Sequence, residues 1–578
     1  MYCIKLPNQN AAFETSGGVT ISQACAAAGF PMDLVCGGRG TCGKCAVRID
    51  RNGVSETVLA CRTVVDCDMT VYLEDHQLTR DASIVTEGRS AHSTNLSPAL
   101  SKRCMTKAEL LPSHCGSYLE PAFPSLLRTF SRLMADASVD RVTFVSYRDQ
   151  LLAVEPGDTT DLLYGGAIDI GTTSVVLYAY DLNTGTLLHT VSALNGQIVR
   201  GADVITRILH TRQNEDGLDE LTGHIRDTIH TLLNQAEEKI PGFRSHLYHL
   251  VLCGNSTMQH LFLGLDPYGL SQDPFVNITA GPVRCSAAAA EIDMPAGGVV
   301  EFLPLLGGFV GADTAAVLLT LPTDRGPCLM VDLGTNGEIA VGNGTGYKVA
   351  STACGPALEG GNIACGMRGM EGAIERVSLQ DDKLTYRVIG GVEPLGLCGS
   401  AIIDAVAELR RAGIIDESGR LLPRDEFLAQ HPDSPLAEYL GEAGEYNTAF
   451  FFTKGDRPVY LSQHDVRQIQ LAKSSILSGC MTLLEEAGLS PDQLDALYLA
   501  GAFGNYIDID RALEIGLLPP VPRDRIFSIG NGAGKGVQMC LLDQGEMDRC
   551  KALPASIEHV ELATSPKFME TYIMNMNF

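Results

Sequence analysis

The sequence of 578 residues contains no tryptophan, and only 6% of its residues are aromatic. No hydrophobic run reaches the roughly 20 residues that a membrane-spanning helix needs, so we expect no membrane segment. The first residues, 1–7, lack the basic and apolar regions of a secretory signal. Because the chain nevertheless carries 18 cysteines, we expect a reducing, cytoplasmic environment rather than a framework of disulfides.

Basic residues are also scarce relative to acidic ones. There are 43 Lys and Arg against 69 Asp and Glu, which gives a formal net charge of −26. Such a field repels nucleic acid and anionic lipid, and no cluster of Lys or Arg interrupts it, so we expect neither nucleic acid nor membrane as a partner. The 60 glycines predict many tight turns, which suits a fold that holds cofactors with its main chain.

Four cysteines near the N-terminus have the spacing of a metal-cluster site. Cys36, Cys42, Cys45 and Cys61 follow the pattern C-x5-C-x2-C-x15-C in and after a glycine-rich stretch. Glycines let main-chain N–H groups turn toward the sulfurs, and a distant fourth cysteine can close the cage, so the pattern predicts a 2Fe-2S cluster and electron transfer. The first gap is one residue longer than in plant-type ferredoxins. The alternatives are a zinc site, which usually pairs two short C-x2-C units, and a set of reduced core thiols.

Composition and periodicity divide the chain into four parts. A β-rich stretch with one short helix is followed by a polar stretch without aromatic residues, a small α/β region and a long remainder. The polar stretch predicts a flexible linker, because it cannot bury enough apolar surface to order itself. We therefore expect an N-terminal domain over residues 1–80, a linker over 81–103, a small middle domain over 104–163 and the main domain over 164–578.

Local patterns predict individual elements in the first and third parts. Residues 21–28 predict a helix and residues 69–73 a strand. In the middle domain we expect a helix around 125–130 and a hairpin that joins residues 142–145 to 151–154.

Two stretches of the main domain repeat one device. In residues 166–174 and again in 331–338, an apolar strand ends in an aspartate, a glycine-containing turn follows, and a second strand returns. The N–H groups and hydroxyls of such a turn suit a phosphate, and an aspartate at the strand end can hold a hydrated magnesium ion. Two hairpins of this kind, facing each other, would hold a triphosphate from both sides.

A third stretch, residues 496–506, predicts a buried strand that enters a glycine turn, suited to close main-chain approach to an adenosine. One aspartate before one glycine turn is common in ordinary hairpins. Three features in this order match the phosphate and adenosine motifs of the ATPase fold shared by actin, sugar kinases and heat-shock chaperones. Residues 530–536 fail as a Walker A motif, because Ile529 and Gly536 stand where Gly and Ser or Thr are required. That stretch is either a glycine loop near the nucleotide or a plain turn.

The combination resembles the reductive activators of corrinoid proteins, in which an N-terminal 2Fe-2S ferredoxin domain precedes an ASKHA-type ATPase domain. Further stretches that look like this family are residues 201–208, 254–260, 307–314, 397–400 and 468–473. The resemblance implies a multidomain α+β and α/β fold with a β-grasp-like ferredoxin domain, a small middle domain and a duplicated actin-like (ASKHA) ATPase domain.

The resemblance also implies a function. It is the ATP-dependent one-electron reduction of a corrinoid protein from Co(II) to Co(I), in a methyltransferase, O-demethylase or acetyl-CoA-pathway system. The implied cofactors are a 2Fe-2S cluster, ATP and Mg²⁺. The implied partners are a corrinoid protein and an upstream low-potential electron donor, and a homodimer is one assembly that the resemblance allows.

On this hypothesis the site residues fall into sets. The cluster ligands are Cys36, Cys42, Cys45 and Cys61, and Asp169 and Asp332 organise magnesium. The phosphates contact Gly171, Thr172, Thr173, Gly334, Thr335, Asn336 and Gly337, and the adenosine is bordered by Gly501, Ala502, Phe503, Gly504 and Asn505. The group that orients the attacking water is sought among Asp203, Asp313 and Glu338, each of which also fits a structural turn or helix cap.

Two other functions remain as alternatives. The chain could be an ATP-driven electron donor to another low-potential enzyme such as a dehydratase, or a nucleotide-gated scaffold whose cluster is only structural. Cys354 and Cys365 could hold a second cluster only with a partner subunit, because two cysteines cannot complete a cage.

Overall fold

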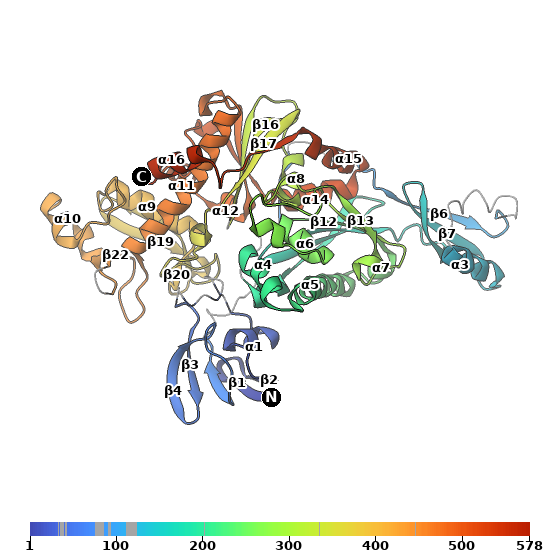
Figure 1. The fold of residues 1–578 in the computed structure, drawn as a ribbon, viewed down its shortest axis with the longest axis horizontal. Coiled ribbons are helices and arrows are strands. Elements are labelled where there is room, and N and C mark those ends of the chain that lie inside the picture. The colour runs from blue at the N-terminus through green and yellow to red at the C-terminus, as the bar shows by residue number, and fades with distance from the viewer. Residues whose placement is uncertain are drawn as a thin grey trace.

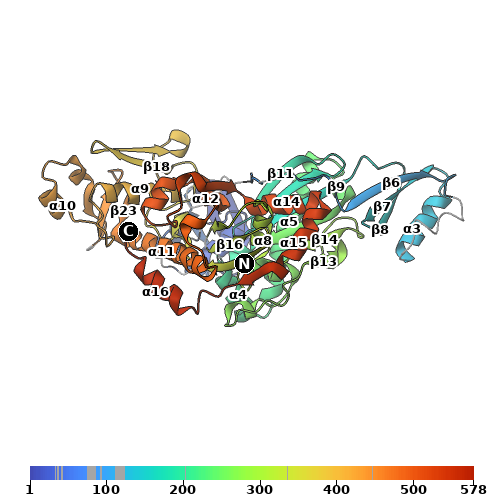
Figure 2. The ribbon, with the colours of Figure 1, turned by 90° about the horizontal axis from the view of Figure 1, so that it is seen from above.

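The computed structural model describes residues 1–32, 34, 38, 40, 43–74, 86–90, 94–110, 124–201, 203–334, 336–444 and 447–578, apart from the side chains of Ala502, Phe503 and Asn505. Figure 1 shows a small N-terminal domain below a two-lobed body, with a second small domain at the far end of one lobe. In the view from above, the body is elongated and the N-terminus lies near its centre (Figure 2). No helix within the described ranges is long and apolar enough to cross a membrane.

The N-terminal domain is a five-stranded sheet with one helix. The strand order is β2-β1-β5-β3-β4; β1 and β5 pair in parallel, and the other three pairs are antiparallel. Helix α1 begins with a capping box, in which Thr20 and Gln23 satisfy each other's main-chain N–H groups. This arrangement confirms the expected β-grasp-like α+β domain. Its elements are β1 (Tyr2–Leu6), β2 (Ala11–Thr15), α1 (Ile21–Ala27), β3 (Ala46–Arg51), β4 (Val54–Leu59) and β5 (Met69–Tyr72).

The small middle domain is an antiparallel sheet of order β6-β7-β8 with one helix packed on it. Its core contains Phe130 of the helix and Val142 and Phe144 of the sheet. The helix and the hairpin lie where the sequence places them, although the first strand begins at Leu100, before the expected boundary at residue 104. The elements are β6 (Leu100–Thr106), α3 (Pro124–Ala135), β7 (Arg141–Tyr147) and β8 (Gln150–Pro156).

The first lobe of the main domain contains a six-stranded sheet of order β11-β10-β9-β12-β14-β13. Strands β9 to β11 form an antiparallel meander, and β12 and β14 continue the sheet in parallel with β9. Its strands are β9 (Tyr164–Ile170), β10 (Ser174–Asp181), β11 (Thr186–Leu194), β12 (Leu247–Gly254), β13 (Val283–Ser286) and β14 (Val299–Phe302). Its helices are α4 (Val204–Gln213), α5 (Gly217–Lys239), α6 (Ser256–Leu263), α7 (Ala287–Ala290) and α8 (Ala312–Leu319).

The second lobe contains a sheet of order β25-β24-β15-β16-β17-β26 and two smaller three-stranded sheets. The strands of the large sheet are β15 (Cys328–Leu333), β16 (Gly337–Asn343), β17 (Gly346–Thr352), β24 (Ala496–Ala500), β25 (Ile526–Gly530) and β26 (Ile557–His559). The small sheets comprise β18 (Ala373–Gln380), β19 (Lys383–Val388), β20 (Gly396–Leu397), β21 (Leu440–Glu442), β22 (Thr448–Phe451) and β23 (Tyr460–Ser462). The helices are α9 (Gly399–Arg411), α10 (Arg424–Gln430), α11 (Gln463–Glu486), α12 (Gly501–Tyr506), α13 (Ile509–Glu514) and α16 (Pro566–Met574).

The two large sheets repeat one topology. Strands β11-β10-β9-β12-β14 of the first correspond in order and direction to β17-β16-β15-β24-β25 of the second. This repeat confirms the duplicated actin-like fold that the repeated hairpins predict.

Helices α8, α14 (Gly532–Leu542) and α15 (Gln544–Ala552) join the two lobes. Helix α14 follows β25 of the second sheet but packs on β9 and β12 of the first. Alternate residues of β15 face opposite sides, so Met330 joins the core around α14 while Leu329 and Val331 join the core of the second lobe. The turn between β25 and α14 therefore lies where the lobes meet.

Two glycine-containing stretches differ from expectation. After strand β24, Gly501 begins helix α12, so residues 496–506 form a strand and a helix rather than a strand and a glycine turn. Residues 530–536 contain the start of helix α14, capped by the Asn531 side chain, and are therefore neither a loop nor a plain turn. In both places a glycine with positive φ, Gly501 at 84° and Gly530 at 65°, redirects the chain from strand to helix.

The linker is bound to the main domain over part of its length. Residues 86–90 lie along the turn between β25 and α14, and Ser97 exchanges main-chain hydrogen bonds with Leu542 and Gln544. The expectation of a flexible linker throughout 81–103 is therefore wrong for these residues, because main-chain pairing holds them without any apolar side chain. Residues 81–85 and 91–93 lie outside the described ranges.

Candidate functional site

The first predicted phosphate turn joins β9 to β10. Gly171 N–H donates to Ser174 O over 2.9 Å, and a Cβ atom on Gly171 would lie 2.7 Å from that oxygen, so the turn requires glycine. The Asn255 amide donates to Thr172 Oγ1 over 3.0 Å. Thr173 O accepts the N–H of Asn195 over 2.9 Å. These contacts fix the turn in one conformation.

A buried arginine contacts the main chain of the same turn from the protein interior. Arg207 in α4 is fully buried, and its guanidinium donates to Gly201 O over 2.9 Å, to Gln197 Oε1 over 3.1 Å and to Thr172 O. Burial lowers the pKa of Arg207 to about 9. The guanidinium thus holds the main chain of the turn from the side of the protein interior.

The second predicted phosphate turn joins β15 to β16. Gly334 N–H donates to Asn336 O over 3.1 Å, and Cys354 Sγ lies 3.2 Å from Gly334 O. Gly337 lies in strand β16, opposite Leu333, and belongs to the sheet rather than to the turn. Thr335 lies outside the described residues.

Four half-buried carboxylates gather between the two turns. Asp169 and Asp332 are the last residues but one of strands β9 and β15. Asp313 lies in the first turn of α8, and Glu338 lies in β16. Burial, and then the charges of Asp313 and Asp169, raise the pKa of Asp332 to about 7. Burial and the Asp169 charge raise the pKa of Asp313 to about 6. The pKa of Glu338 is raised for the same reasons, by burial first and then by Asp313 and Asp332.

This concentration of negative charge calls for a cation. Among the described residues, no group of three or more His, Cys, Asp and Glu side chains is close enough to bind a metal ion directly. Mg²⁺ does not need three direct protein ligands, because it keeps several of its waters and is bound by one or two carboxylates together with substrate phosphates. The carboxylates therefore fit a hydrated magnesium ion held with a nucleotide.

Asp169 is held in place from two sides. The Asn531 amide donates to Asp169 Oδ2 over 3.1 Å, and Cys253 Sγ lies 3.7 Å from Asp169 Oδ1. Burial raises the pKa of Asp169, although both of these hydrogen bonds oppose the shift. Asn531 is also the N-cap of α14, because its Oδ1 accepts the Gly534 N–H over 2.7 Å.

The remaining predicted residues occupy different positions. Gly501 approaches the carboxylate cluster so closely that a Cβ atom would lie 2.5 Å from Asp332 Oδ1. Gly504 lies in α12, and the side chains of Ala502, Phe503 and Asn505 lie outside the described part of the chain. Asp203 caps α4, accepting the N–H of Thr206 over 2.8 Å.

Two of the four predicted cluster cysteines lie in the described part of the N-terminal domain. Cys45 and Cys61 are buried, and their Sγ atoms lie 3.1 Å apart, too far for a disulfide but close enough to share a metal. Gly38, Gly40 and Gly43 have φ values of 74°, 74° and 70°, a main-chain conformation that favours glycine. Cys36 and Cys42 lie outside the described residues. The loop therefore fits a small iron-sulfur cluster.

Lys44, directly before Cys45, contacts the main domain. Lys44 Nζ donates to Gly360 O over 3.0 Å and to Gly366 O, both in the second lobe. Helix α1 contacts η3 (Gly196–Arg200), which belongs to the first lobe. The N-terminal domain thus touches both lobes.

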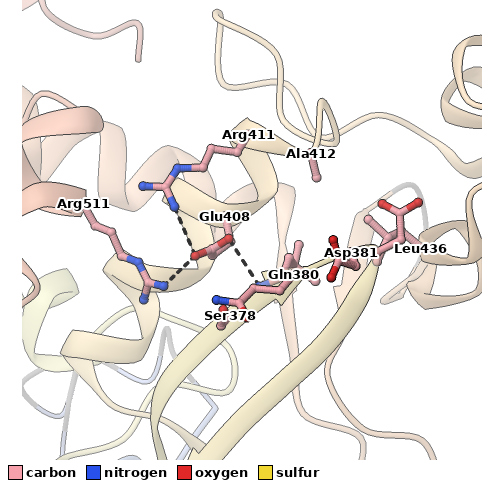
Figure 3. A pocket seen from close by; sticks show the side chains of 10 residues that line it. Ser378, Gln380, Asp381, Glu408, Arg411, Ala412, Leu436 and Arg511 are labelled. Carbon is pink, nitrogen blue, oxygen red and sulfur yellow. Dashed lines mark hydrogen bonds and ion pairs between the residues drawn. The ribbon is translucent and has the colours of Figure 1, made fainter.

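A polar cavity of about 530 Å³ lies elsewhere, between helix α9 and the β18–β19 hairpin. Figure 3 shows Glu408 between Arg411 and Arg511, and the Arg511 Nη2 atom lies 2.5 Å from Glu408 Oε1. Arg511 also pairs with the buried Asp404 over 2.7 Å. These charges neutralise one another, and none of the predicted site residues lines the cavity. We therefore interpret the charged side chains along it as a structural ion-pair network.

Several site residues were not identified from the sequence. Asn531, Asn255 and Arg207 each lie in a stretch that the sequence singles out, yet the local pattern predicts no role for them. Their partners Asp169 and Thr172 lie far from them along the chain. An asparagine directly before a helix is the one local signal available, since it indicates an N-cap.

Comparison with known proteins identifies the family. Three family models match in order: a 2Fe-2S iron-sulfur cluster binding domain over residues 4–66, the RACo middle region over 164–325, and the C-terminal ASKHA domain of RACo over 326–578. The chain is 41% identical over 576 residues to the corrinoid activation enzyme RamQ of Eubacterium limosum, with 96% of each chain covered. The chain belongs to the family of corrinoid activation enzymes.

Two further relatives agree with this corrinoid activation family. One is the [Co(II) methylated amine-specific corrinoid protein] reductase of Methanosarcina barkeri, which is 26% identical over 72% of this chain and 77% of its own. The other is the solved structure of a reductive activator for corrinoid, iron-sulfur protein, which superposes with a TM-score of 0.73 at 28% identity and covers 100% of this chain and 98% of its own. The matching 2Fe-2S and ASKHA domain models, together with the family, show that this activase carries a 2Fe-2S cluster and binds ATP with Mg²⁺.

Proposed function

We propose that this chain uses ATP to drive the one-electron reduction of a corrinoid protein from Co(II) to Co(I). The observation that carries the proposal is the joining, in one polypeptide, of an iron-sulfur domain to a duplicated ATPase fold whose carboxylates are clustered between two phosphate turns. The relatives support it, since one is named a corrinoid activation enzyme and another a Co(II) corrinoid protein reductase.

The need for ATP follows from redox energetics. A 2Fe-2S cluster of the plant-ferredoxin type has a potential near −400 mV. For a one-electron transfer, each further 59 mV of unfavourable gap lowers the equilibrium constant about tenfold. A nucleotide-dependent change that binds one state of the corrinoid protein more tightly can offset this gap, because differential affinity shifts the equilibrium.

In this proposal the two phosphate turns and the carboxylates form the ATPase site. Asp169 and Asp332 hold the hydrated magnesium. The turn residues Gly171–Thr173 and Gly334–Asn336 contact the phosphates, together with Gly337 at the start of β16. Residues 501–505 border the adenosine. Asp313 and Glu338 are the candidates to orient the attacking water, because both lie in the field of the magnesium carboxylates. Asp203 is the weaker candidate, since its side chain caps a helix.

The N-terminal domain supplies the electron in this proposal, with the cluster held by Cys36, Cys42, Cys45 and Cys61. Its contacts to both lobes, through Lys44 and helix α1, give it a direct response to lobe movement.

Other partners and the setting of the reaction complete the proposal. We infer an upstream low-potential electron donor, because one-electron reduction consumes an electron per cobalt. The 18 cysteines and the net charge of −26 suit the cytoplasm, and a homodimer is an assembly that sedimentation can test.

The test is reduction of a Co(II) corrinoid protein, followed by the Co(I) absorbance, with the activase chemically reduced under anaerobic conditions. Repeated turnover in the presence of ATP and Mg²⁺, and none with a non-hydrolysable ATP analogue, is the expected result. Reduction that is equally fast without nucleotide would contradict the proposal. A dehydratase that accepts the electron while the corrinoid protein does not would favour the alternative acceptor.

A further inference from the structure

Residues 86–90, which we call the strap, lie at the junction of the two lobes. Arg89 N–H donates to Ile529 O over 2.9 Å, and Asn531 N–H donates to Glu87 O over 3.0 Å, so the strap extends the edge of strand β25 by an antiparallel bridge. The Tyr178 hydroxyl of β10 donates to Thr86 O over 2.9 Å. The strap is thus bonded to both lobes, although it belongs to the segment that connects the iron-sulfur domain.

The fit of the strap is tight at one glycine. A Cβ atom on Gly88 would lie 2.0 Å from Asn531 O and 2.7 Å from Lys535 Cβ. The first of these atoms belongs to the main chain and cannot move aside. Any side chain at this position must therefore displace the strap from the start of α14.

One residue connects the strap to the carboxylate cluster. Asn531 receives the strap through its main-chain N–H, caps α14 through Oδ1, and donates from Nδ2 to Asp169 Oδ2 over 3.1 Å. The same Nδ2 lies 3.3 Å from the Tyr178 hydroxyl, which itself bonds to the strap. If the strap were displaced, the Asn531 main-chain N–H would lose its acceptor, Glu87 O. The Tyr178 hydroxyl, which lies next to the Asn531 side chain, would lose its acceptor, Thr86 O.

We propose that the strap is a positioning element of the nucleotide site: it fixes Asn531, Asn531 fixes the Asp169 carboxylate, and docking of the strap and binding of magnesium-nucleotide stabilise each other. The inference rests on the proposed function, in that it places the magnesium at Asp169. Coupling between two binding events is reciprocal, so whatever factor the strap adds to nucleotide affinity the nucleotide adds to strap docking.

The consequence concerns how far the iron-sulfur domain can travel. Glu74 ends the described part of that domain, and the docked strap begins 12 residues later at Thr86, which limits the span to about 40 Å for an extended chain. With the strap released, the next main-chain anchor among the described residues is Ser97, and the limit becomes about 80 Å. Loss of nucleotide would therefore roughly double the maximum reach of the domain.

The test uses the full-length, cluster-loaded protein and measures its affinity for Mg²⁺ with a non-hydrolysable ATP analogue by calorimetry. Gly88→Ala should weaken binding by about 5-fold to 150-fold, the usual range of coupling between sites. Tyr178→Phe removes the hydrogen bond to Thr86 O of the strap and the one that the Tyr178 hydroxyl accepts from Asn531 Nδ2, and it should weaken binding about 5-fold or more. Tyr180→Phe is the matched control, because Tyr180 lies two residues along the same strand and its hydroxyl donates to Gln538 instead; its affinity should equal that of the wild type.

A second measurement requires no variant. In the wild-type protein, hydrogen exchange at the Arg89 and Asn531 amides should slow when the magnesium-bound analogue is added. Unchanged exchange, or variants that bind the analogue as tightly as the wild type, would overturn the inference even if cobalt reduction still depends on ATP. If the wild type itself fails to bind the analogue, the proposed ATPase site is wrong. Should Gly88→Ala fail to fold, as judged by its cluster absorbance, Tyr178→Phe and the exchange rates decide the question.

Discussion

Replacing Asp332 by asparagine should make the nucleotide-free protein more stable at pH 8 while it removes magnesium-nucleotide turnover. Burial, together with the charges of Asp313 and Asp169, raises the pKa of Asp332 to about 7 from an ordinary value of 3.8. The folded protein therefore carries an unfavourable negative charge at this position above neutral pH. Asparagine keeps the shape of the side chain and removes that charge.

The magnitude follows from the pKa. Each tenfold change in a protonation constant corresponds to about 1.4 kcal/mol, so the ionised carboxylate costs at most about 4 kcal/mol. Because the side chain is only half-buried, solvent screening reduces this to about 1–3 kcal/mol. When a carboxyl has a higher pKa in the folded than in the unfolded chain, the protein loses stability as the pH rises from the unfolded to the folded pKa. The advantage of Asp332→Asn should therefore be absent below about pH 4 and complete above about pH 7.

The assay is thermal unfolding of the nucleotide-free protein at pH 8 and pH 5, followed by circular dichroism because the chain has no tryptophan. The variant should unfold at a higher temperature than the wild type at pH 8, with a smaller difference at pH 5. Adding Mg²⁺ and an ATP analogue should stabilise the wild type much more than the variant. Asp492→Asn removes an exposed carboxylate and controls for the change in net charge. A variant that is less stable than the wild type at pH 8, or that gains as much from magnesium-nucleotide, would refute the reasoning.

Three further predictions address other parts of the molecule. Cys45→Ala should abolish the visible cluster spectrum and cobalt reduction but leave ATP hydrolysis largely intact, and parallel loss of both activities would show that the sites are not separate. Gly501→Ala should weaken magnesium-nucleotide binding at least about 10-fold, since φ there is 84° and the new Cβ would lie 2.5 Å from a carboxylate oxygen; Gly488→Ala, at φ 68° with open space around it, should leave that affinity unchanged. Glu301→Gln should destabilise the protein by about 3 kcal/mol in denaturant unfolding at pH 7, because Glu301 is buried 2.6 Å from Lys551 Nζ. Burial raises the pKa of Glu301, but pairing with His249 and Lys551 outweighs burial and lowers the pKa to about 2. The difference in stability between Glu301→Gln and the wild type should therefore shrink as the pH falls from about 4.5 toward 2. A difference that stays constant with pH would count against the ion pair.

The fold was largely predictable because its signals are local. Each phosphate hairpin is an apolar strand, an aspartate and a glycine turn within about ten residues, and its repetition predicts a duplicated sheet. The same holds for the cysteine loop, whose spacing alone indicates a cluster. The Asp169 and Asp332 positions at the strand ends follow from these short patterns.

Other features depend on contacts between distant residues. Asn531 donates to Asp169 across 362 positions of sequence, and neither residue indicates the other. The polar side chains of the strap predict flexibility, but main-chain hydrogen bonds hold it in place. Amino-acid composition cannot indicate such hydrogen bonds. Strand β24 was expected to enter a turn, whereas the positive φ of Gly501 starts a helix instead.

The central claim is that ATP hydrolysis drives an electron transfer that the cluster potential alone does not sustain. The most direct measurement is the amount of Co(I) formed per activase chain at a fixed, buffered redox potential above that of the cobalt couple. With ATP and Mg²⁺ the yield should rise well beyond one Co(I) per chain and stop when ATP is exhausted. A yield that matches the redox buffer alone, whether or not ATP is hydrolysed, would contradict the account.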